Sequence, residues 1–190
     1  MKRSKRGFQK GASVLDVGCG NGRLSEWLEG DVDYLGVDHS EALIRIAQKN
    51  HPQRTFQMAE MSQLDLKLPF DVIFTIAALH HVPERAHRRE TIQRLHNHLK
   101  PKGVVIMTVW NLCQRKYSTA WWKALWNWVR HAGKKGGWND LWIPWKTEDQ
   151  LRYYHAFTHH ELKQLFHTDL WTIERLYESA FNINVILRKK

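Results

Sequence analysis

Short apolar runs alternate with segments of helical pattern along the first 110 residues of the chain. The runs are rich in Val, Ile, Leu and Phe, which is typical of buried parallel strands. They fall at residues 14–17, 34–38, 55–58, 70–76 and 104–110, and helices are predicted between them at 23–28, 40–50 and 84–99. Strands that alternate with helices predict an α/β fold, in which a parallel sheet carries helices on both faces.

Two local signals refine this pattern. Ser40 is a good N-cap residue, so it is expected to start the helix over 40–50, with Ala42, Leu43 and Ile46 facing inward. Residues 101–103, Pro-Lys-Gly, are predicted to form a turn before the fifth strand.

The last third of the chain has a different texture. Seven of the ten tryptophans lie between Trp121 and Trp145, so residues 111–150 are predicted to be a Trp-rich insertion after the fifth strand. Thr158 and Glu161 fit a capping box that opens a helix to about residue 167. Residues 171–178 and 181–187 are predicted to form an antiparallel hairpin, and residues 1–190 are predicted to form a single domain because no linker interrupts them.

A glycine loop follows the first strand, with the sequence Asp16-Val17-Gly18-Cys19-Gly20-Asn21-Gly22. Glycines lack Cβ, so such a loop turns tightly and lets a ligand approach the backbone, at the edge of the sheet where open α/β folds bind ligands. Asp16 suits a positively charged amino-acid group, Asp38 at the end of the second strand suits two ribose hydroxyls, and Glu60 suits an adenine edge. For each acid, a helix cap or a solvated loop charge is the alternative.

This loop, followed by Gly36-Val37-Asp38 and by residues 99–103, resembles the class I S-adenosylmethionine-dependent methyltransferases. The resemblance implies a Rossmann-like seven-stranded sheet whose last strand is antiparallel, with S-adenosylmethionine as cofactor. The cofactor contacts it implies are Asp16, Gly18, Cys19, Gly20, Asp38, His39, Glu60, Met61, Ile76 and Ala77.

A narrower resemblance begins at residues 76–81, Ile-Ala-Ala-Leu-His-His, and continues through Val109-Trp110, Ile143-Pro144-Trp145 and Arg152-Tyr153-Tyr154-His155. These segments are similar to the tRNA methyltransferases that esterify 5-carboxymethyluridine at the wobble position. The resemblance implies a tRNA substrate and allows a small zinc-binding activator protein as partner. The residues expected to line the reaction site are His80, His81, Arg152, Tyr153 and His155.

The chemistry of an ester-forming methyl transfer is compatible with these residue types. A carboxylate is ionised at neutral pH, so it needs in-line positioning rather than a strong base. Arg152 is suited to clamp the carboxylate or an RNA phosphate. Adjacent residues of a strand point to opposite faces, so one of Tyr153 and Tyr154 is expected to pack in the interior, as is one histidine of each adjacent pair.

Composition changes this picture in three ways. The 190 residues carry a formal net charge of +10, which favours a polyanionic partner. The chain has only two cysteines, no apolar run long enough for a membrane helix, and no signal-peptide core after its basic N-terminus. We therefore expect a cytoplasmic protein that is not associated with a membrane. The twelve histidines lack metal-ligand spacing, so no metal site is expected.

The Trp-rich segment has three interpretations. Trp121, Trp122, Trp126 and Trp128 have helical spacing, which favours an amphipathic helix that packs on the sheet or covers the site. Alternatively, some rings stack on an unpaired RNA base, flanked by Lys123, Arg130, Lys134 and Lys135, or they bind a protein. Two alternatives to tRNA methylation also remain: a methyltransferase for a small carboxylate or another metabolite, and a non-catalytic RNA-binding relative of the fold.

Overall fold

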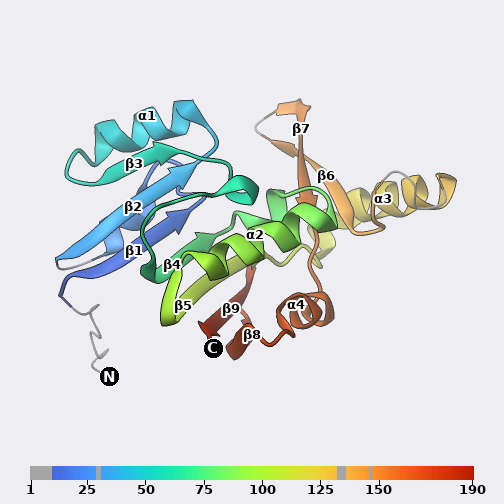
Figure 1. Ribbon diagram of the computed structural model, residues 1–190. Helices are drawn as coiled ribbons and strands as arrows, with labels where there is room; N and C mark the ends of the chain where they lie inside the picture. Colours follow the sequence, from blue (N-terminus) through green and yellow to red (C-terminus); the bar gives the residue numbers. More distant parts are fainter. Residues whose placement is uncertain (1–9, 29–30, 132–135, 146) are drawn as a thin grey trace, which may run out of the picture.

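The computed structural model describes residues 10–28, 31–131, 136–145 and 147–190 (Figure 1). The predicted basic arm therefore lies mostly outside the described residues, as do Lys134 and Lys135.

The centre of the fold is a seven-stranded sheet with the order β3-β2-β1-β4-β5-β9-β8. Strands β1 to β5 pair in parallel, whereas β9 is antiparallel to both of its neighbours. This confirms the predicted α/β sheet with an antiparallel last strand. The strands are β1 (Ala12–Val17), β2 (Val32–Asp38), β3 (Thr55–Met58), β4 (Phe70–Ile76), β5 (Leu99–Trp110), β8 (Trp171–Glu178) and β9 (Asn182–Lys189).

Two hydrophobic cores cover the two faces of this sheet. Alternate residues of one strand enter different cores, since Leu15 packs in the first core and Val14 in the second. The first core includes side chains of α2 (Arg85–Asn97) and α4 (His159–Phe166), and the second includes side chains of α1 (Glu41–Asn50). Helices therefore cover both faces, as the alternating pattern predicted. No helix in the described ranges is long and apolar enough to span a membrane.

Two helical predictions need correction. The segment after the glycine loop is a short 3-10 helix, η1 (Arg23–Trp27), rather than an α-helix. In α1, Ser40 is the N-cap as predicted, and its Oγ accepts a 3.4 Å hydrogen bond from the Leu43 N–H. The buried residues of α1 are Ile44 and Ala47, whereas Ala42, Leu43 and Ile46 are exposed. The helix therefore packs on the sheet through Ile44 and Ala47. Its sequence offers two apolar stripes, and only the tertiary packing decides which of them is buried.

The predicted turn at residues 101–103 lies within strand β5 rather than before it. Phe70 of β4 pairs with Leu99, and Val72 pairs with Val104. Asp71 alone thus faces four residues of β5, and this irregularity contains Lys102 with φ of 63°. The predicted turn is thus an irregularity within β5 that interrupts its pairing with β4.

The described residues between 111 and 150 lie outside the seven-stranded sheet. They form the 3-10 helix η4 (Arg115–Tyr117), helix α3 (Ser118–Arg130) and strand β6 (Asp140–Trp145), which pairs with β7 (Thr147–His155) in a separate two-stranded sheet. A small core of its own holds this region together, made by Leu112, Ala124, Leu141, Tyr154 and Ala156. Figure 1 shows α3 projecting from the body of the molecule.

The expectation that the tryptophan helix packs on the sheet or covers the site is wrong. Only the Trp121 and Ala124 side of α3 contacts the small core. Trp122 and Trp126 on the other side are 72% and 68% exposed. The apolar stripe of this helix is wider than the surface available to cover it.

Candidate functional site

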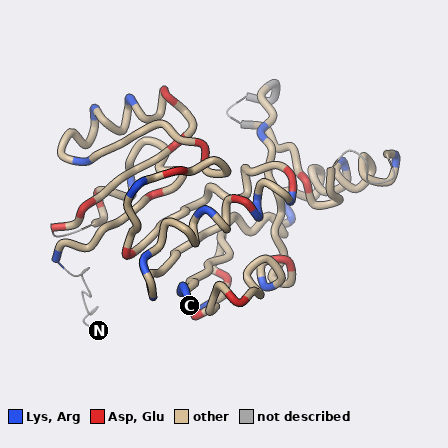
Figure 2. Tube along the Cα trace, viewed as in Figure 1, with Lys and Arg blue, Asp and Glu red and all other residues tan. Residues whose placement is uncertain are grey.

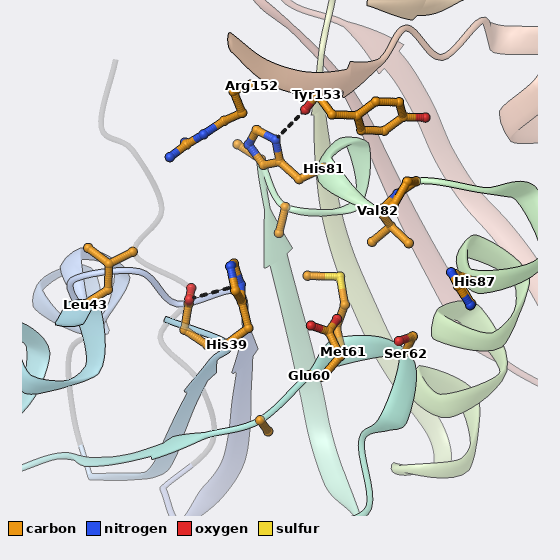
Figure 3. A pocket seen from close by; sticks show the side chains of 16 residues that line it. His39, Leu43, Glu60, Met61, Ser62, His81, Val82, His87, Arg152 and Tyr153 are labelled. Atoms are coloured by element: carbon orange, nitrogen blue, oxygen red, sulfur yellow. Dashed lines mark hydrogen bonds and ion pairs between the residues drawn. The ribbon is translucent and has the colours of Figure 1, made fainter. Parts of the chain in front are cut away.

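A cavity of about 580 Å³ lies at the carboxyl ends of the parallel strands. It is lined by the turns after β1, β2, β3 and β4, by the start of α2, and by β7 of the two-stranded sheet. The sheet order reverses between β1 and β4, and crevices at such switch points bind ligands in open α/β folds. Figure 3 shows the side chains that converge on the cavity.

The glycine loop forms one wall through its backbone. Gly18 has φ of +78°, and a Cβ built on it would lie 2.5 Å from the Cβ of Ala78. The loop is fixed to β2 because the N–H groups of Gly18 and Cys19 both donate to the Val37 carbonyl, at 2.8 and 3.0 Å. A side chain at position 18 would therefore collide with the turn after β4, so glycine is required there.

Asp38 joins the glycine loop to the turn after β2. Its Oδ2 accepts a 2.9 Å hydrogen bond from the Gly20 N–H, and its Oδ1 accepts one of 2.9 Å from the Ser40 N–H. His39 Nδ1 lies 3.5 Å from Oδ1. Each carboxylate oxygen has a second acceptor site, and Asp38 lines the cavity. The carboxylate is thus held in place by backbone and can still accept from ligand hydroxyls.

Several predicted cofactor contacts do line the cavity. They are Gly18, Asp38, His39, Glu60, Met61 and Ala77. Ala77 has φ of 53°, which strains a non-glycine residue, and its N–H donates to Thr108, whose backbone carbonyl and Oγ1 both lie 3.0 Å away. These hydrogen bonds fix the strained backbone of the turn after β4, which forms part of the cavity wall.

The other predicted cofactor contacts are placed differently. Asp16 is 2% exposed and accepts a 2.8 Å hydrogen bond from the Tyr34 hydroxyl, so it faces the interior rather than the cavity. Burial raises the pKa of the Asp16 carboxyl to about 7, against the opposing effect of the Tyr34 hydrogen bond. Burial also raises the pKa of the Cys19 thiol. Gly20 contributes its N–H to Asp38, and Ile76 ends β4 beside the cavity without lining it.

Three predicted residues meet on the opposite side of the cavity. His81, Arg152 and Tyr153 line it, and Figure 3 shows them across from His39 and Met61. His81 Nδ1 lies 3.1 Å from the Tyr153 carbonyl oxygen, which can only accept, so Nδ1 carries the proton. Burial lowers the pKa of His81. The neutral ring therefore has a lone pair on Nε2 that is available to a ligand.

His80 and His155, the remaining predicted residues, do not line this cavity. His80 is fully buried, its Nδ1 accepts from the Trp110 N–H at 3.2 Å, and its ring stacks on Tyr154. His155 lies between Asp140 Oδ1 at 2.7 Å and Glu161 Oε1 at 2.6 Å. Tyr153 at the cavity and Tyr154 in the interior are divided as strand alternation predicts. His81 likewise lies at the cavity and His80 in the interior, but these two residues belong to a 3-10 helix rather than to a strand.

Sequence reasoning missed other residues of the wall. Leu43, Ser62, Val82 and His87 also line the cavity. Leu43 comes from α1, Ser62 from the turn after β3, and His87 from α2. Val82 directly follows the 3-10 helix η3 (Leu79–His81). His87 lies in the helix predicted over 84–99, but neither it nor the other three residues carried a sequence signal that marked them for the site.

The cavity fits S-adenosylmethionine. Its volume is within the range of small-molecule sites. Asp38 would hold the ribose hydroxyls, the glycine-loop backbone would lie against the amino-acid portion, and Leu43, Ala59 and Met61 offer apolar contacts for the adenine.

Comparisons with known proteins agree with this geometry. The family described as "Methyltransferase domain" matches residues 2–169. The tRNA (carboxymethyluridine(34)-5-O)-methyltransferase of Arabidopsis thaliana is 34% identical over 101 residues, which are 53% of this chain and 24% of that protein. The trans-aconitate 2-methyltransferase of Yersinia pseudotuberculosis is 33% identical over 95 residues, which are 48% of this chain and 36% of that protein.

The chain thus spans between a quarter and about a third of the length of these two relatives. Among solved structures, a SAM-dependent methyltransferase from Methanosarcina mazei has a TM-score of 0.78 at 22% identity and covers 96% of this chain and 94% of its own. At this identity the likeness shows a shared fold.

Proposed function

The chain belongs to the S-adenosylmethionine-dependent methyltransferases, and from this premise we propose that it methylates the carboxylate of a 5-carboxymethyl group on the wobble uridine of tRNA. The observation that carries the proposal is that Arg152 and a neutral His81 both line the cavity, and Figure 3 shows them across from His39. A cation and a neutral ring suit an anionic acceptor that needs no base.

The chemistry requires little of the protein beyond positioning. When bound, S-adenosylmethionine supplies a methyl group on a positively charged sulfur, which a carboxylate oxygen can accept without losing a proton. Arg152 would orient the carboxylate through its guanidinium. The Tyr153 carbonyl holds the His81 ring through Nδ1, so Nε2 is aimed by the backbone rather than by a mobile side chain.

The similarity to other proteins supports a carboxylate substrate. Two of the matched relatives have names that contain a carboxylate, one on a uridine of tRNA and one in aconitate, whereas others are ubiquinone biosynthesis O-methyltransferases. The net charge of +10 favours the polyanion. Figure 2 shows Lys and Arg distributed over several elements, and α2 beside the cavity carries Arg85 and Arg89 on its exposed side.

The test is methyl transfer from labelled cofactor to tRNA that carries 5-carboxymethyluridine, with and without an activator protein, followed by nucleoside mass spectrometry. We expect a methyl ester at the wobble uridine. Unlabelled tRNA in both arms would refute the proposal.

A small carboxylate such as aconitate is the second candidate, favoured by the Yersinia relative. Salt separates the two substrates. Activity on tRNA should fall steeply between about 50 and 200 mM salt because phosphate contacts release counterions. Activity on a small carboxylate should change much less.

Arg152 offers the sharpest variant. Arg152→Gln should raise the KM for the carboxylate substrate by about 10- to 100-fold, since a hydrogen bond to a charged group contributes about 1.5–3 kcal/mol. Binding of S-adenosylmethionine, measured by calorimetry, should stay within about twofold. Arg175→Gln, which removes one positive charge from β8, is the matched control. Equal effects of both variants would show that only net charge matters.

A further inference from the structure

A second cavity, of about 750 Å³, lies beside the first. Tyr153 and Pro83 line both cavities, so these two residues form the partition between them. The rest of the second cavity comes from α2 and the residue before it, from α4 and its N-cap, from Asn127 of α3, from His155 of β7, and from residues 136–142 before and within β6. The segment that the sequence singled out for its tryptophans thus supplies one side of this cavity.

The floor of this cavity is a buried polar network. His155, which is 3% exposed, joins Asp140 and Glu161 through its two ring nitrogens. Both partners are acceptors, so both nitrogens carry protons and the ring is a cation. Burial disfavours that charge, but the two carboxylates outweigh it and raise the pKa of His155. Arg88, which is 5% exposed, supplies the second cation and donates to the Tyr153 hydroxyl at 3.3 Å.

The charges of this floor balance. Two cations, Arg88 and His155, face two carboxylates, Asp140 and Glu161. Asp140 is itself satisfied by the Tyr153 hydroxyl at 2.6 Å as well as by His155. A charged ligand would bring to this buried floor a charge that no opposite charge compensates. The floor therefore suits a ligand that is polar but neutral.

The walls are aromatic. Trp142 is 57% exposed and packs edge-on against Tyr153, with ring centroids 5.6 Å apart. Trp138 is 45% exposed and lies against Trp121 at 5.5 Å. Both indoles line the cavity, whereas the highly exposed Trp122 of α3 does not. Each indole has one side supported by protein and substantial surface left for a planar partner.

We propose that the second cavity binds a nucleobase of the substrate RNA, that of a nucleotide adjacent to the methylated uridine. A nucleobase is planar, neutral and rich in hydrogen-bonding groups, which matches aromatic walls over a charge-balanced floor. The shared partition at Tyr153 and Pro83 puts the two sites at neighbouring positions, so adjacent nucleotides can fill them together. This inference rests on the proposed tRNA substrate.

The test is a double-mutant cycle between protein and RNA. A synthetic anticodon stem-loop carries an abasic site on the 5′ or the 3′ side of the modified uridine, and its dissociation constant is measured by fluorescence anisotropy. Trp142→Ala should weaken binding of the intact RNA by about 5- to 100-fold, the range for one base stacked on an aromatic ring. One of the two abasic RNAs should bind the unmodified protein more weakly by a similar factor.

The decisive quantity is the coupling. If the base and the indole contact each other, Trp142→Ala should have little further effect on that abasic RNA, because the interaction is already absent. Trp142→Phe should restore most of the binding. Trp122→Ala is the matched control, since it removes an indole that is more exposed and lies outside the cavity.

The outcomes separate the two proposals. Additive effects of Trp142→Ala and both abasic sites, or equal effects of Trp142→Ala and Trp122→Ala, would overturn the nucleobase site while leaving the tRNA substrate standing. RNA that binds with the expected coupling but is never methylated would overturn the proposed function alone. Failure of the unmodified protein to bind the RNA would overturn both.

Discussion

The carboxylate of Asp38 provides the most direct test of how the glycine loop binds its cofactor. Asp38→Ala removes two 2.9 Å hydrogen bonds to backbone N–H groups, those of Gly20 and Ser40. It also removes the acceptor expected to hold the two ribose hydroxyls. A hydrogen bond to a charged group contributes about 1.5–3 kcal/mol, so loss of two from the complex should weaken cofactor binding by at least about 100-fold.

The same change should also lower stability, because the loop loses its tie to β2. The loss of two hydrogen bonds to backbone N–H groups is expected to cost about 2–3 kcal/mol, or about 5–10 °C in melting temperature for a chain of this size. Calorimetric titration with S-adenosylmethionine measures the affinity, and thermal unfolding without cofactor measures the stability.

Asp71 provides a matched control at the opposite end of the sheet. Its carboxylate ties β4 to β1 and β5, accepting from the Ser13 N–H at 2.8 Å, from Ser13 Oγ at 2.7 Å and from Lys100 Nζ at 2.8 Å. Asp71→Ala should therefore lower the melting temperature without changing the cofactor affinity. The interpretation of Asp38 as a cofactor ligand is refuted if Asp38→Ala binds S-adenosylmethionine within about threefold of the unmodified protein.

Two further predictions concern the loop and the buried network. Gly18→Ala should weaken cofactor binding by at least about tenfold, because the new Cβ would lie 2.5 Å from that of Ala78. Gly11→Ala is the control: Gly11 has φ of +77°, but no atom lies within 4 Å of a Cβ built there. This variant has the left-handed strain without the collision, so it should leave binding unchanged. His155→Gln should lower the free energy of unfolding in urea by about 3 kcal/mol, because it leaves two carboxylates without their cation. The pKa of His155 is raised in the folded protein. The charged ring therefore contributes its full stabilisation below about pH 6.5, and this contribution is lost as the pH rises through the pKa of His155 in the folded protein. The unmodified protein should accordingly lose stability toward pH 9 more steeply than the variant. Equal slopes in the two proteins would contradict the assignment of a charged ring.

The local pattern of the sequence determined the sheet and the place of its ligand. Strand periodicity located β4 at the bounds that the structure shows, and the glycine loop with Asp38 located the cavity wall. These features depend on residues close together in the chain, where backbone geometry and burial act directly. The division of Tyr153 and Tyr154 follows from the same local rule, although the pattern does not say which of the two faces the cavity. His80 and His81 lie in a 3-10 helix, so strand alternation does not account for their division.

The tertiary structure decided what depends on distant partners. Asp16 and Asp38 both lie near the carboxyl ends of buried strands, but Asp16 is turned to the Tyr34 hydroxyl and only Asp38 reaches the cavity. His155 belongs to a motif predicted for the reaction site, yet Asp140 and Glu161, from β6 and α4, bind both of its nitrogens. The tryptophans were grouped by composition, whereas only packing separates those that line a cavity from those that project on α3. A side chain's neighbours across the fold set its charge and direction, and they are not encoded in the residues beside it.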